Sequence, residues 1–460
     1  MPFRSINPAT LETCGEWTAM SPGEVIAAVG RAGEAFAGFT RVGVGARAAM
    51  LGKLAREMSA DREAMALLAT QEMGKPITQA RIEVDRCVHA LELLTVEGPK
   101  WLAEEPRASE AAYSGVRFDP VGVILGVMPW NFPFWQIVRF ASGVLLAGNG
   151  VLVKPAPSTA GCALRLEGCF RRAGFGEGVY TTLLAEVEDL EAVVAHDAVA
   201  GVSLTGSVRA GRALATLGAR FGKPAVLELG GSDAFVVLDD GDVAAAAKAA
   251  AGARCFNSGQ SCIAAKRFIA TAGVYEAFRE AFAGAMGALR VGDPAEERTE
   301  VGPLARGDLL EGLRGQFRAA VSAGGRVVGA AGEVPGRGHY FAPTVVELPH
   351  PGAARHLHNP AWTAETFGPL AVLVRAEDRG QALALAADSR YGLGLSIWTK
   401  DVAGARAAAG GMAVGNVYIN APVKSNVRLP FGGVGDSGYG RELGSEGVRQ
   451  FTNVKTVWVG

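Results

Sequence analysis

The sequence predicts an α/β fold built around parallel sheets, and three observations lead to that prediction. From Val121 onward, short apolar strands alternate with single helices, which is the pattern of parallel sheets joined by right-handed crossovers. Of the 460 residues, 49% are hydrophobic and 20% are charged, a globular composition. The length is about three times that of a typical domain, so two or three packed units are expected.

The N-terminal third is predicted to be helical. Ser21 begins a helix, because it is followed by a proline at the first helical position and by Glu24, which completes a capping box. A periodic run over residues 47–73 predicts a second helical region, and a further helix reaches about Glu97. Around residues 111–116 the pattern changes to short alternation, which predicts an exposed hairpin.

The middle of the chain predicts alternating strands and helices. The predicted strands are 121–128, 150–154 and 199–205, and the predicted helices are 134–146, 159–172 and 207–217. A second α/β run begins at Ala225 and reaches about Val414. The final residues 452–459 alternate in the manner of a strand that would be an exposed edge in a monomer.

Composition excludes several classes of function. A formal charge of −1 argues against nucleic acid or an anionic membrane as the main partner. No apolar stretch approaches the length of a membrane span, and no basic, apolar leader opens the sequence. Six cysteines without a CxxC pair predict neither a disulfide framework nor a zinc site, and the six histidines show no metal-ligand spacing. We therefore expect no metal and a reducing, cytoplasmic setting.

Two short motifs carry candidate catalytic groups. Residues 256–262, Phe-Asn-Ser-Gly-Gln-Ser-Cys, place Cys262 among small, polar and turn-forming residues, where a thiol can be reached by a substrate. Residues 227–231, Leu-Glu-Leu-Gly-Gly, place Glu228 among apolar residues, which disfavour its charged form and suit a general base. The remaining cysteines are interpreted as small core residues: Cys14, Cys87, Cys162, Cys169 and Cys255.

Three predicted strands end in segments that suit a nucleotide. These segments are Met-Pro-Trp-Asn-Phe-Pro at 128–133, Lys-Pro-Ala-Pro at 154–157 and Thr-Gly-Ser-Val-Arg-Ala-Gly at 205–211. Open parallel sheets bind ligands at the carboxyl ends of their strands, and the third segment opens a helix whose N–H groups suit a pyrophosphate. Each segment alone is more often a simple loop, because none contains G-x-G-x-x-G.

Taken together, these motifs resemble the aldehyde dehydrogenase superfamily. The family pattern E-L-G-G followed by G-Q-x-C matches in order and spacing, and the resemblance runs from about Asn7 to Val459. It implies a Rossmann-type cofactor domain (1–107 and 121–227), an α/β catalytic domain (228–415), a return to the cofactor domain (416–444) and a β oligomerisation arm (108–120 and 445–460). In the family the arm joins a neighbour's sheet, which implies a homodimer or homotetramer.

The resemblance also assigns residues to a cofactor, NAD or NADP. It implies that Lys154 binds the adenosine ribose, Gly206 and Ser207 contact the pyrophosphate, and Trp130 lines the nicotinamide end. Glu365, in the E-x-F-G-P motif, is expected to hold the nicotinamide ribose. The same site is expected to include Pro157, Leu229 and Phe367. Relatives that prefer NAD often carry a glutamate where this chain has Pro157, and Ser158 and Arg209 are nearby, so dual use with a slight lean towards NAD is expected.

The chemistry implied is oxidation of an aldehyde to a carboxylic acid. Attack by the Cys262 thiolate gives a thiohemiacetal, whose oxyanion is expected to be stabilised by the Asn131 amide and the Cys262 backbone N–H. Loss of hydride to the nicotinamide then leaves a thioester. Glu228 is expected to activate water to hydrolyse it. Members that pass the acyl group to coenzyme A lack this glutamate, so hydrolysis is favoured.

The substrate prediction rests on Arg139. Gln136 and Arg139 lie three residues apart on one helix face, and many members that oxidise apolar aldehydes have a large aromatic at the second position. An arginine there suits an aldehyde with a distal carboxylate, as in succinate semialdehyde dehydrogenases, which this chain also resembles at residues 266–268 and 429–433. Some of those enzymes carry a second arginine where this chain has Phe256, and a basic residue where it has Gly435.

Two further residues, Phe132 and Ser425, are expected at the same substrate site. The alternatives are a general aldehyde dehydrogenase, in which Arg139 would form a structural salt bridge, and an inactive structural member. Inactive members lose the cysteine, the glutamate or the cofactor lysine, and Cys262, Glu228 and Lys154 are all present.

Overall fold

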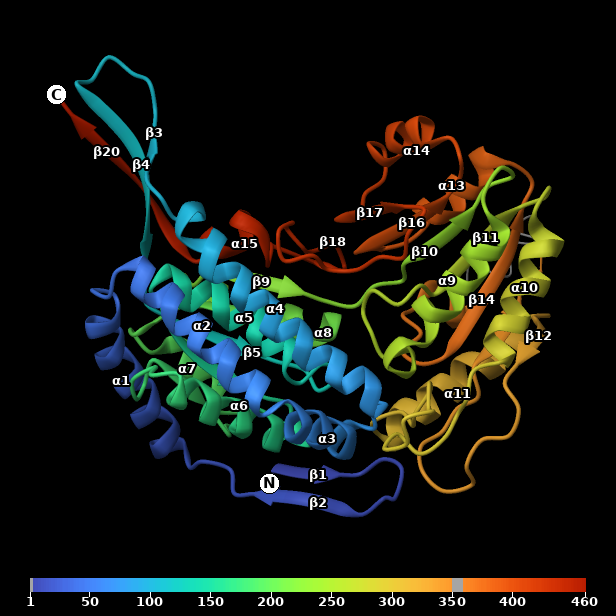
Figure 1. Cartoon of the computed structure of the whole chain (residues 1–460), viewed down its shortest axis with the longest axis horizontal. Helices are drawn as coiled ribbons and strands as arrows, with labels where there is room; N and C mark the ends of the chain where they lie inside the picture. The colour runs from blue at the N-terminus through green and yellow to red at the C-terminus, as the bar shows by residue number, and fades with distance from the viewer. Residues whose placement is uncertain (1–2, 350–358) are drawn as a thin grey trace.

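A computed structural model describes residues 3–349 and 359–460. Figure 1 shows two α/β bodies side by side, each a sheet covered by helices, and a narrow β arm that projects from one of them. The two larger sheets have six and seven strands, and a three-stranded sheet forms the arm. This arrangement confirms the α/β class predicted from the alternation of strands and helices.

The six-stranded sheet has a break in its strand order that defines a binding edge. Its order is β19-β9-β8-β5-β6-β7, and every pair is parallel except β19 with β9. From β5 the chain proceeds outward to β6 and β7, then returns to place β8 on the other side of β5. The carboxyl ends of β5 and β8 therefore flank the switch point, where open sheets bind ligands. The strands are β5 (Val123–Val127), β6 (Gly150–Lys154), β7 (Tyr180–Thr182), β8 (Val199–Thr205), β9 (Ala225–Glu228) and β19 (Gly438–Tyr439).

Helices bury both faces of this sheet, which explains why its strands are continuous apolar runs. One face packs against α2 (Val44–Ala60), α3 (Arg62–Met73), α4 (Ile77–Trp101), α5 (Trp135–Ala147) and α6 (Ala160–Arg172). The other face packs against α1 (Pro22–Phe39), α7 (Leu190–Ala195) and α8 (Val208–Arg220). The predicted capping box at Ser21 is present, since its side chain accepts from Glu24 N and the Glu24 carboxylate accepts from Ser21 N.

The seven-stranded sheet has the order β12-β13-β14-β11-β10-β16-β17 and is parallel except for β12. Its strands are β10 (Ala234–Val237), β11 (Arg267–Thr271), β12 (Arg326–Ala330), β13 (Thr344–Glu347), β14 (Leu370–Ala376), β16 (Gly394–Trp398) and β17 (Asn416–Ile419). Its two faces are covered by α9 (Val243–Cys255) and α10 (Tyr275–Gly287), and by α11 (Gly307–Ser322), α12 (Pro360–Thr363), α13 (Arg379–Ala387) and α14 (Val402–Ala409). The α/β run predicted from Ala225 to Val414 is thus observed.

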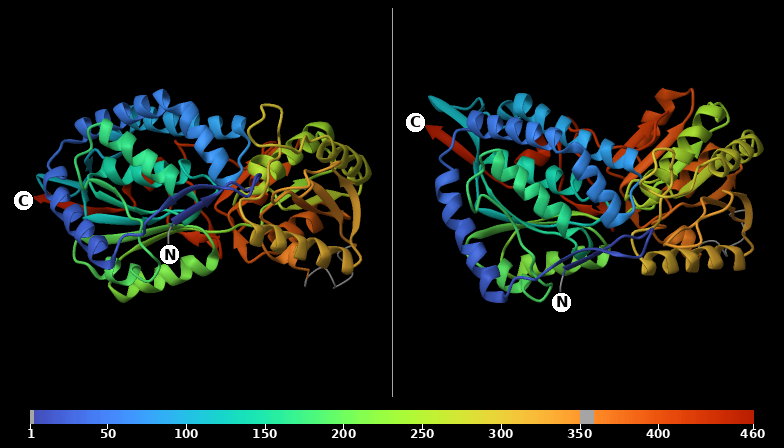
Figure 2. Two further views of the ribbon diagram at one scale, coloured as in Figure 1. Left: turned by 90° about the horizontal axis from the view of Figure 1, so that it is seen from below. Right: turned by 60° about the horizontal axis from the view of Figure 1, so that its bottom comes forward.

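The arm is formed by strands that are far apart in the sequence. β20 (Thr452–Val459) pairs antiparallel with all of β4 (Tyr113–Pro120), and β3 (Glu105–Pro106) pairs with β4 on its other side. The predicted pairing of the hairpin with the C-terminal strand is confirmed. Figure 2 shows the C-terminal strand extending beyond the helices that surround the first sheet.

Shorter elements complete the fold. These are β1 (Phe3–Ile6), β2 (Thr13–Trp17), β15 (Tyr391–Gly392), β18 (Val434–Gly435) and α15 (Gly444–Arg449). The N-terminal β1–β2 hairpin was not anticipated from the sequence, because each strand is short and its polar composition gives a weak strand signal. Among the described helices, none is both long enough and apolar enough to cross a membrane.

Candidate active site

Cys262 follows a tight turn that the backbone adopts with three consecutive left-handed residues. Asn257, Ser258 and Gly259 have φ values of 55°, 54° and 75°. Side-chain bonds stabilise this costly geometry, because Asn257 Nδ2 donates to the carbonyl oxygens of Asn131 (2.7 Å) and Gln260 (3.1 Å). A side chain at Gly259 would collide with the backbone of Gly368, so the turn requires glycine. The result is a preset position for the residues that lead to Cys262.

The thiol of Cys262 is partly buried, and charges of both signs lie near it. Burial raises its pKa to about 11, and the charges of Arg139 and Lys266 oppose that rise. The Lys266 ammonium is fully buried and donates to the carbonyl oxygens of Ser261 (3.0 Å) and Cys262. The thiol is thus mainly protonated at neutral pH, and ionising it requires a proton acceptor nearby.

Glu228 is the buried carboxylate that lines the same cavity as Cys262. It ends β9 and its residue is only 3% exposed. Burial raises its pKa well above the usual value, Arg139 opposes the rise, and Glu442 adds to it. Oε1 has no hydrogen-bond partner among the described residues, and a Cβ on Gly432 would approach it to 2.8 Å. A carboxylate with a raised pKa and a free oxygen is suited to accept a proton near neutral pH.

Asn131 lies between β5 and α5, where the buried carboxylate of Glu83 fixes the backbone. Its Nδ2 donates to Gln260 O at 3.0 Å, which ties the amide directly to the Cys262 turn. Glu83 of α4 accepts from the backbone N–H groups of Phe134 and Trp135, both at 2.9 Å, and pairs with Lys75. Glu83 of α4 therefore fixes the start of α5. The Asn131 amide has a second hydrogen, which it can donate to an oxyanion.

The cavity beside Cys262 and Glu228 measures about 440 Å³. Its wall includes all of the predicted cofactor residues except Pro157: Trp130, Lys154, Gly206, Ser207, Leu229, Glu365 and Phe367. The rings of Trp130 and Phe367 meet edge to face at 5.7 Å. The switch-point segments after β5, β6 and β8 thus converge on one cavity with the two catalytic candidates.

The lining of this cavity fits a dinucleotide. Lys154 is 4% exposed, and its Nζ makes one long bond of 3.4 Å to its neighbour's carbonyl, so its donors are available to hydroxyl groups. Ser207 caps α8 and accepts from Ala210 N, which presents the helix N-terminus to the cavity. A side chain on Gly230 would strike the Glu365 carboxylate, so the backbone there leaves the space open.

Glu365 is held in place by two groups behind the cavity. Oε1 accepts from the backbone N–H of Gly231 at 3.1 Å and lies 3.3 Å from Lys266 Nζ. Because Lys266 also contacts the Cys262 carbonyl, the predicted ribose residue and the nucleophile share one supporting cation.

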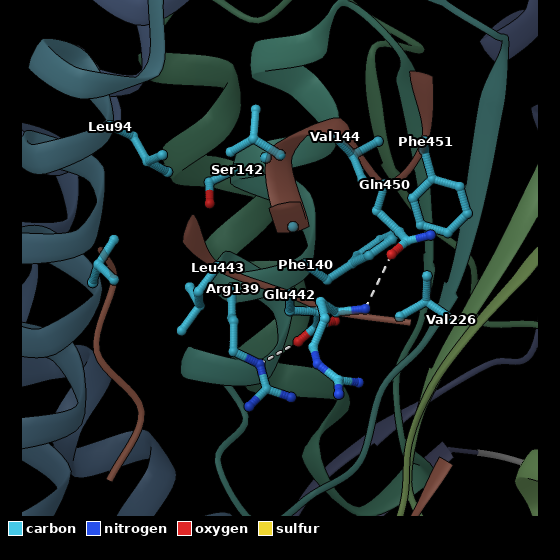
Figure 3. Close-up of a pocket in the computed structure, with 15 residues that line it drawn as sticks. Leu94, Arg139, Phe140, Ser142, Val144, Val226, Glu442, Leu443, Gln450 and Phe451 are labelled. Atoms are coloured by element: carbon cyan, nitrogen blue, oxygen red, sulfur yellow. Dashed lines mark hydrogen bonds and ion pairs between the residues drawn. The ribbon is translucent and has the colours of Figure 1, made fainter. Parts of the chain in front are cut away.

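The structure differs from the expectation that Arg139 offers a free guanidinium to a substrate. Figure 3 shows Arg139 directed at Glu442, with which it forms a buried ion pair. Its Nη2 lies 3.4 Å from Thr205 Oγ1, and its guanidinium lies 5.0 Å from the Phe431 ring centroid. The adjoining cavity, about 20 Å³, holds about one water molecule. The charge of Arg139 is therefore already neutralised by Glu442. A role for Arg139 in substrate binding stays a prediction.

The other predicted substrate residues are Phe132, Gln136 and Ser425. Phe132 stacks on Phe256 with ring centroids 6.2 Å apart, and both pack with Cys262 in one apolar cluster. Gln136 is buried, and its Oε1 has no hydrogen-bond partner among the described residues. Ser425 accepts from Arg86, a residue that the sequence did not single out.

The structure also tests the cysteine and metal expectations. All six cysteines are free, and four of the five interpreted as core residues are buried, but Cys14 is exposed, because β2 is an outer strand. No group of three or more His, Cys, Asp or Glu residues that could hold a metal occurs within 3–349 and 359–460. Three of the six histidines, at positions 350, 356 and 358, lie outside those ranges.

Comparison with known proteins identifies the family. The family model described as "Aldehyde dehydrogenase family" matches residues 1–457, so the chain belongs to the aldehyde dehydrogenase family. A succinate semialdehyde dehydrogenase of Escherichia coli K12, named for NAD(P)+, is 40% identical over 454 residues, 99% of this chain and 97% of that protein. A probable NADP+ succinate-semialdehyde dehydrogenase of Synechocystis is 41% identical over 461 residues, with both chains covered completely.

Solved structures agree with this assignment. Succinic semialdehyde dehydrogenase from Streptococcus pyogenes in complex with NADP+ has a TM-score of 0.95 at 30% identity, with 99% of each chain covered. PnpE in complex with nicotinamide adenine dinucleotide has a TM-score of 0.94 at 31% identity, covering 100% of this chain and 94% of the other. The protein is an NAD(P)-dependent aldehyde dehydrogenase, and its cofactor is NAD or NADP.

Proposed function

We propose that the protein oxidises succinate semialdehyde to succinate, and that it hydrolyses its acyl-enzyme instead of passing the acyl group to coenzyme A. The observation that carries the proposal is that Cys262 and Glu228 line one cavity in a chain about 40% identical, over its full length, to enzymes named for this substrate. Aldehyde oxidation follows from the family, and the semialdehyde is the more specific part of the proposal.

The first chemical step belongs to Cys262. Its thiolate adds to the aldehyde carbon, and the carbonyl oxygen becomes an oxyanion. The Asn131 amide, already fixed by its bond to Gln260 O, supplies one donor, and the Cys262 backbone N–H supplies the second. Because the left-handed turn is held by Asn257, these donors need little rearrangement when charge develops.

NAD or NADP, when bound, accepts the hydride that leaves the aldehyde carbon. Lys154, Gly206 and Ser207 are the residues we assign to its ribose and pyrophosphate, and Glu365 to its second ribose. Trp130, Leu229 and Phe367 line the remaining wall. The acyl group is then held on Cys262 as a thioester.

Glu228 completes the cycle as general base. Its raised pKa allows it to take a proton from water at near-neutral pH. The oxygen of that water then attacks the thioester carbon, and the acid is released. The thiolate leaves and the enzyme is regenerated. This residue is what makes hydrolysis the favoured fate of the thioester.

Steady-state kinetics on matched aldehydes test the substrate assignment. Succinate semialdehyde and butanal have the same number of carbons, and only the first has a carboxylate. A charge-assisted contact of about 1.5 to 3 kcal/mol predicts that kcat/KM favours succinate semialdehyde about tenfold to hundredfold. Equal efficiencies, or a preference for butanal, would replace this proposal with a general aldehyde dehydrogenase.

We also propose a homodimer or homotetramer assembled through the arm. Strand β20 leaves apolar side chains exposed, with Val454 at 62% and Trp458 at 53%. Exposed edge strands of this kind are normally covered by a partner. Deleting residues 452–460 should yield smaller species in sedimentation, together with aggregation. A full-length protein that sediments as a monomer at micromolar concentration would refute the assembly.

The free state of all six cysteines is consistent with a reducing, cytoplasmic setting, which we include in the proposal.

A further inference from the structure

Most of the cations near the catalytic turn pair with a described carboxylate, and Arg86 does not. Arg139 pairs with Glu442, Lys266 with Glu365, and Lys75 with Glu83. Among the residues that the structure describes, neither Arg86 nor Arg254 has an ion-pair partner. Arg254 is fully buried and donates to Gly259 O and Thr366 Oγ1, whereas Arg86 donates only through Nη2, to the carbonyl and hydroxyl oxygens of Ser425. Arg86 is only partly exposed, and burial lowers its pKa, with Arg139 adding to the decrease. A half-buried guanidinium without an anion is an unusual arrangement that a bound carboxylate would complete.

Arg86 is positioned near the aldehyde end of the site by its contact with α5. Its guanidinium lies 4.4 Å from the centroid of the Trp135 ring, and Trp135 follows Asn131 by four residues. Trp135 and Phe132 belong to the apolar cluster that packs against Cys262, and neither lines the cofactor cavity. Arg86 therefore lies outside the cofactor cavity, against an aromatic residue that follows Asn131 closely in the sequence.

The chemistry of Arg86 suits the carboxylate of a short aldehyde acid. Arginine binds a carboxylate through two parallel N–H groups, and Nε and Nη1 of Arg86 have no hydrogen-bond partner among the described residues. Ser425 adds a hydroxyl beside the guanidinium.

We propose that Arg86, together with Ser425, binds the distal carboxylate of the substrate and so determines specificity for acidic aldehydes. In this proposal Arg86 supplies the cation that is absent at Phe256, while Arg139 stays paired with Glu442. The inference rests on the proposed function, because it assumes a substrate that carries a carboxylate.

The test measures the ratio of kcat/KM for succinate semialdehyde to that for butanal. Arg86→Gln should lower this ratio about tenfold to hundredfold, because the charge-assisted contact is lost. Arg86→Lys, which keeps the charge, should recover part of the ratio. The matched control is Arg81→Gln on the same helix, where the arginine pairs with Glu63 and Glu297 instead, and the ratio should be unchanged.

A second readout does not require turnover of the semialdehyde. Succinate should inhibit butanal oxidation competitively, and its inhibition constant should rise at least about tenfold in Arg86→Gln. If the wild-type ratio is near one, the proposed function itself fails. If the wild type prefers succinate semialdehyde but Arg86→Gln changes neither the ratio nor succinate inhibition, only the assignment of Arg86 is overturned. Thermal unfolding of each variant identifies a loss of folding, which would lower both activities together and leave the ratio intact.

Discussion

The two sides of Cys262 are built differently. On the cofactor side, segments from three strand ends surround a cavity of about 440 Å³, and Lys154 forms no ion pair with a described residue. On the substrate side, aromatic rings such as Phe132 and Phe256 pack together, and the charged groups are mostly paired. The first side could hold a ligand common to a whole family, because glycines and other small residues form much of the cavity wall. The second side can discriminate between aldehydes, because each charge or ring that contacts the substrate changes which aldehyde fits.

Because the regions around Cys262 differ in this way, a substitution in each region should affect a different property of the enzyme. Changes at the turn should affect every aldehyde equally, changes at the cofactor side should affect the choice between NAD and NADP, and changes at the substrate side should affect the choice of aldehyde.

The largest effect is expected at the nucleophile. Cys262→Ala should lower turnover at least about a thousandfold with every aldehyde, because the sulfur forms the covalent intermediate. Cofactor affinity, measured by fluorescence titration, should stay close to that of the wild type. Cys14→Ala is the matched control, since this cysteine is exposed on β2 and should leave turnover unchanged. Substantial turnover in Cys262→Ala would exclude the thioester route.

A smaller, selective effect is expected at Pro157, which ends the segment after β6. Pro157→Glu should lower kcat/KM for NADP relative to NAD by about tenfold, because a carboxylate repels the 2′-phosphate and can accept from a free 2′-hydroxyl. Pro157→Gln is the neutral control and should change the ratio much less. If the two variants behave alike, position 157 does not contact the adenosine ribose.

A change in pH profile is expected at Arg139. Burial raises the pKa of Glu228 and the nearby Arg139 charge opposes that rise, so Arg139→Gln should raise the pKa further. Because the base must be ionised, activity in the variant should be lost at a higher pH than in the wild type as the solution is made more acidic. The effect should be the same for succinate semialdehyde and butanal, and Arg139→Lys should largely restore the wild-type profile. A loss confined to the acidic substrate would instead return Arg139 to carboxylate binding.

The sequence predicts the large elements well, because strand and helix periods are local. The strands at 150–154 and 199–205 match β6 and β8 residue for residue, and the buried helix α5 lies within one residue of its predicted bounds. The cofactor-side motifs were also recognisable, since each directly follows a strand and strand ends must meet at one edge of a parallel sheet.

The supporting residues could not be predicted in the same way, because their partners are distant in the sequence. Glu83 binds the start of α5 from a separate helix, and Arg86 reaches Ser425 across more than three hundred positions. Glu442, which pairs with Arg139, lies outside every motif recognised in the sequence. Long-range ion pairs of this kind have no periodic signal, so a charged residue on a predicted helix looks like a surface residue until its partner is known.

In the proposed mechanism a succinyl thioester forms on Cys262, and Glu228 is needed to release it. Intact-protein mass spectrometry of Glu228→Gln, quenched within seconds of mixing with succinate semialdehyde and NAD(P)+, tests this claim directly. We predict a burst of reduced cofactor close to one per active site, and a mass increase of one succinyl group on the intact protein, which digestion of the quenched sample assigns to the peptide that contains Cys262. A Glu228→Gln enzyme that turns over as fast as the wild type, or that shows the burst without any acyl group on Cys262, would contradict the account.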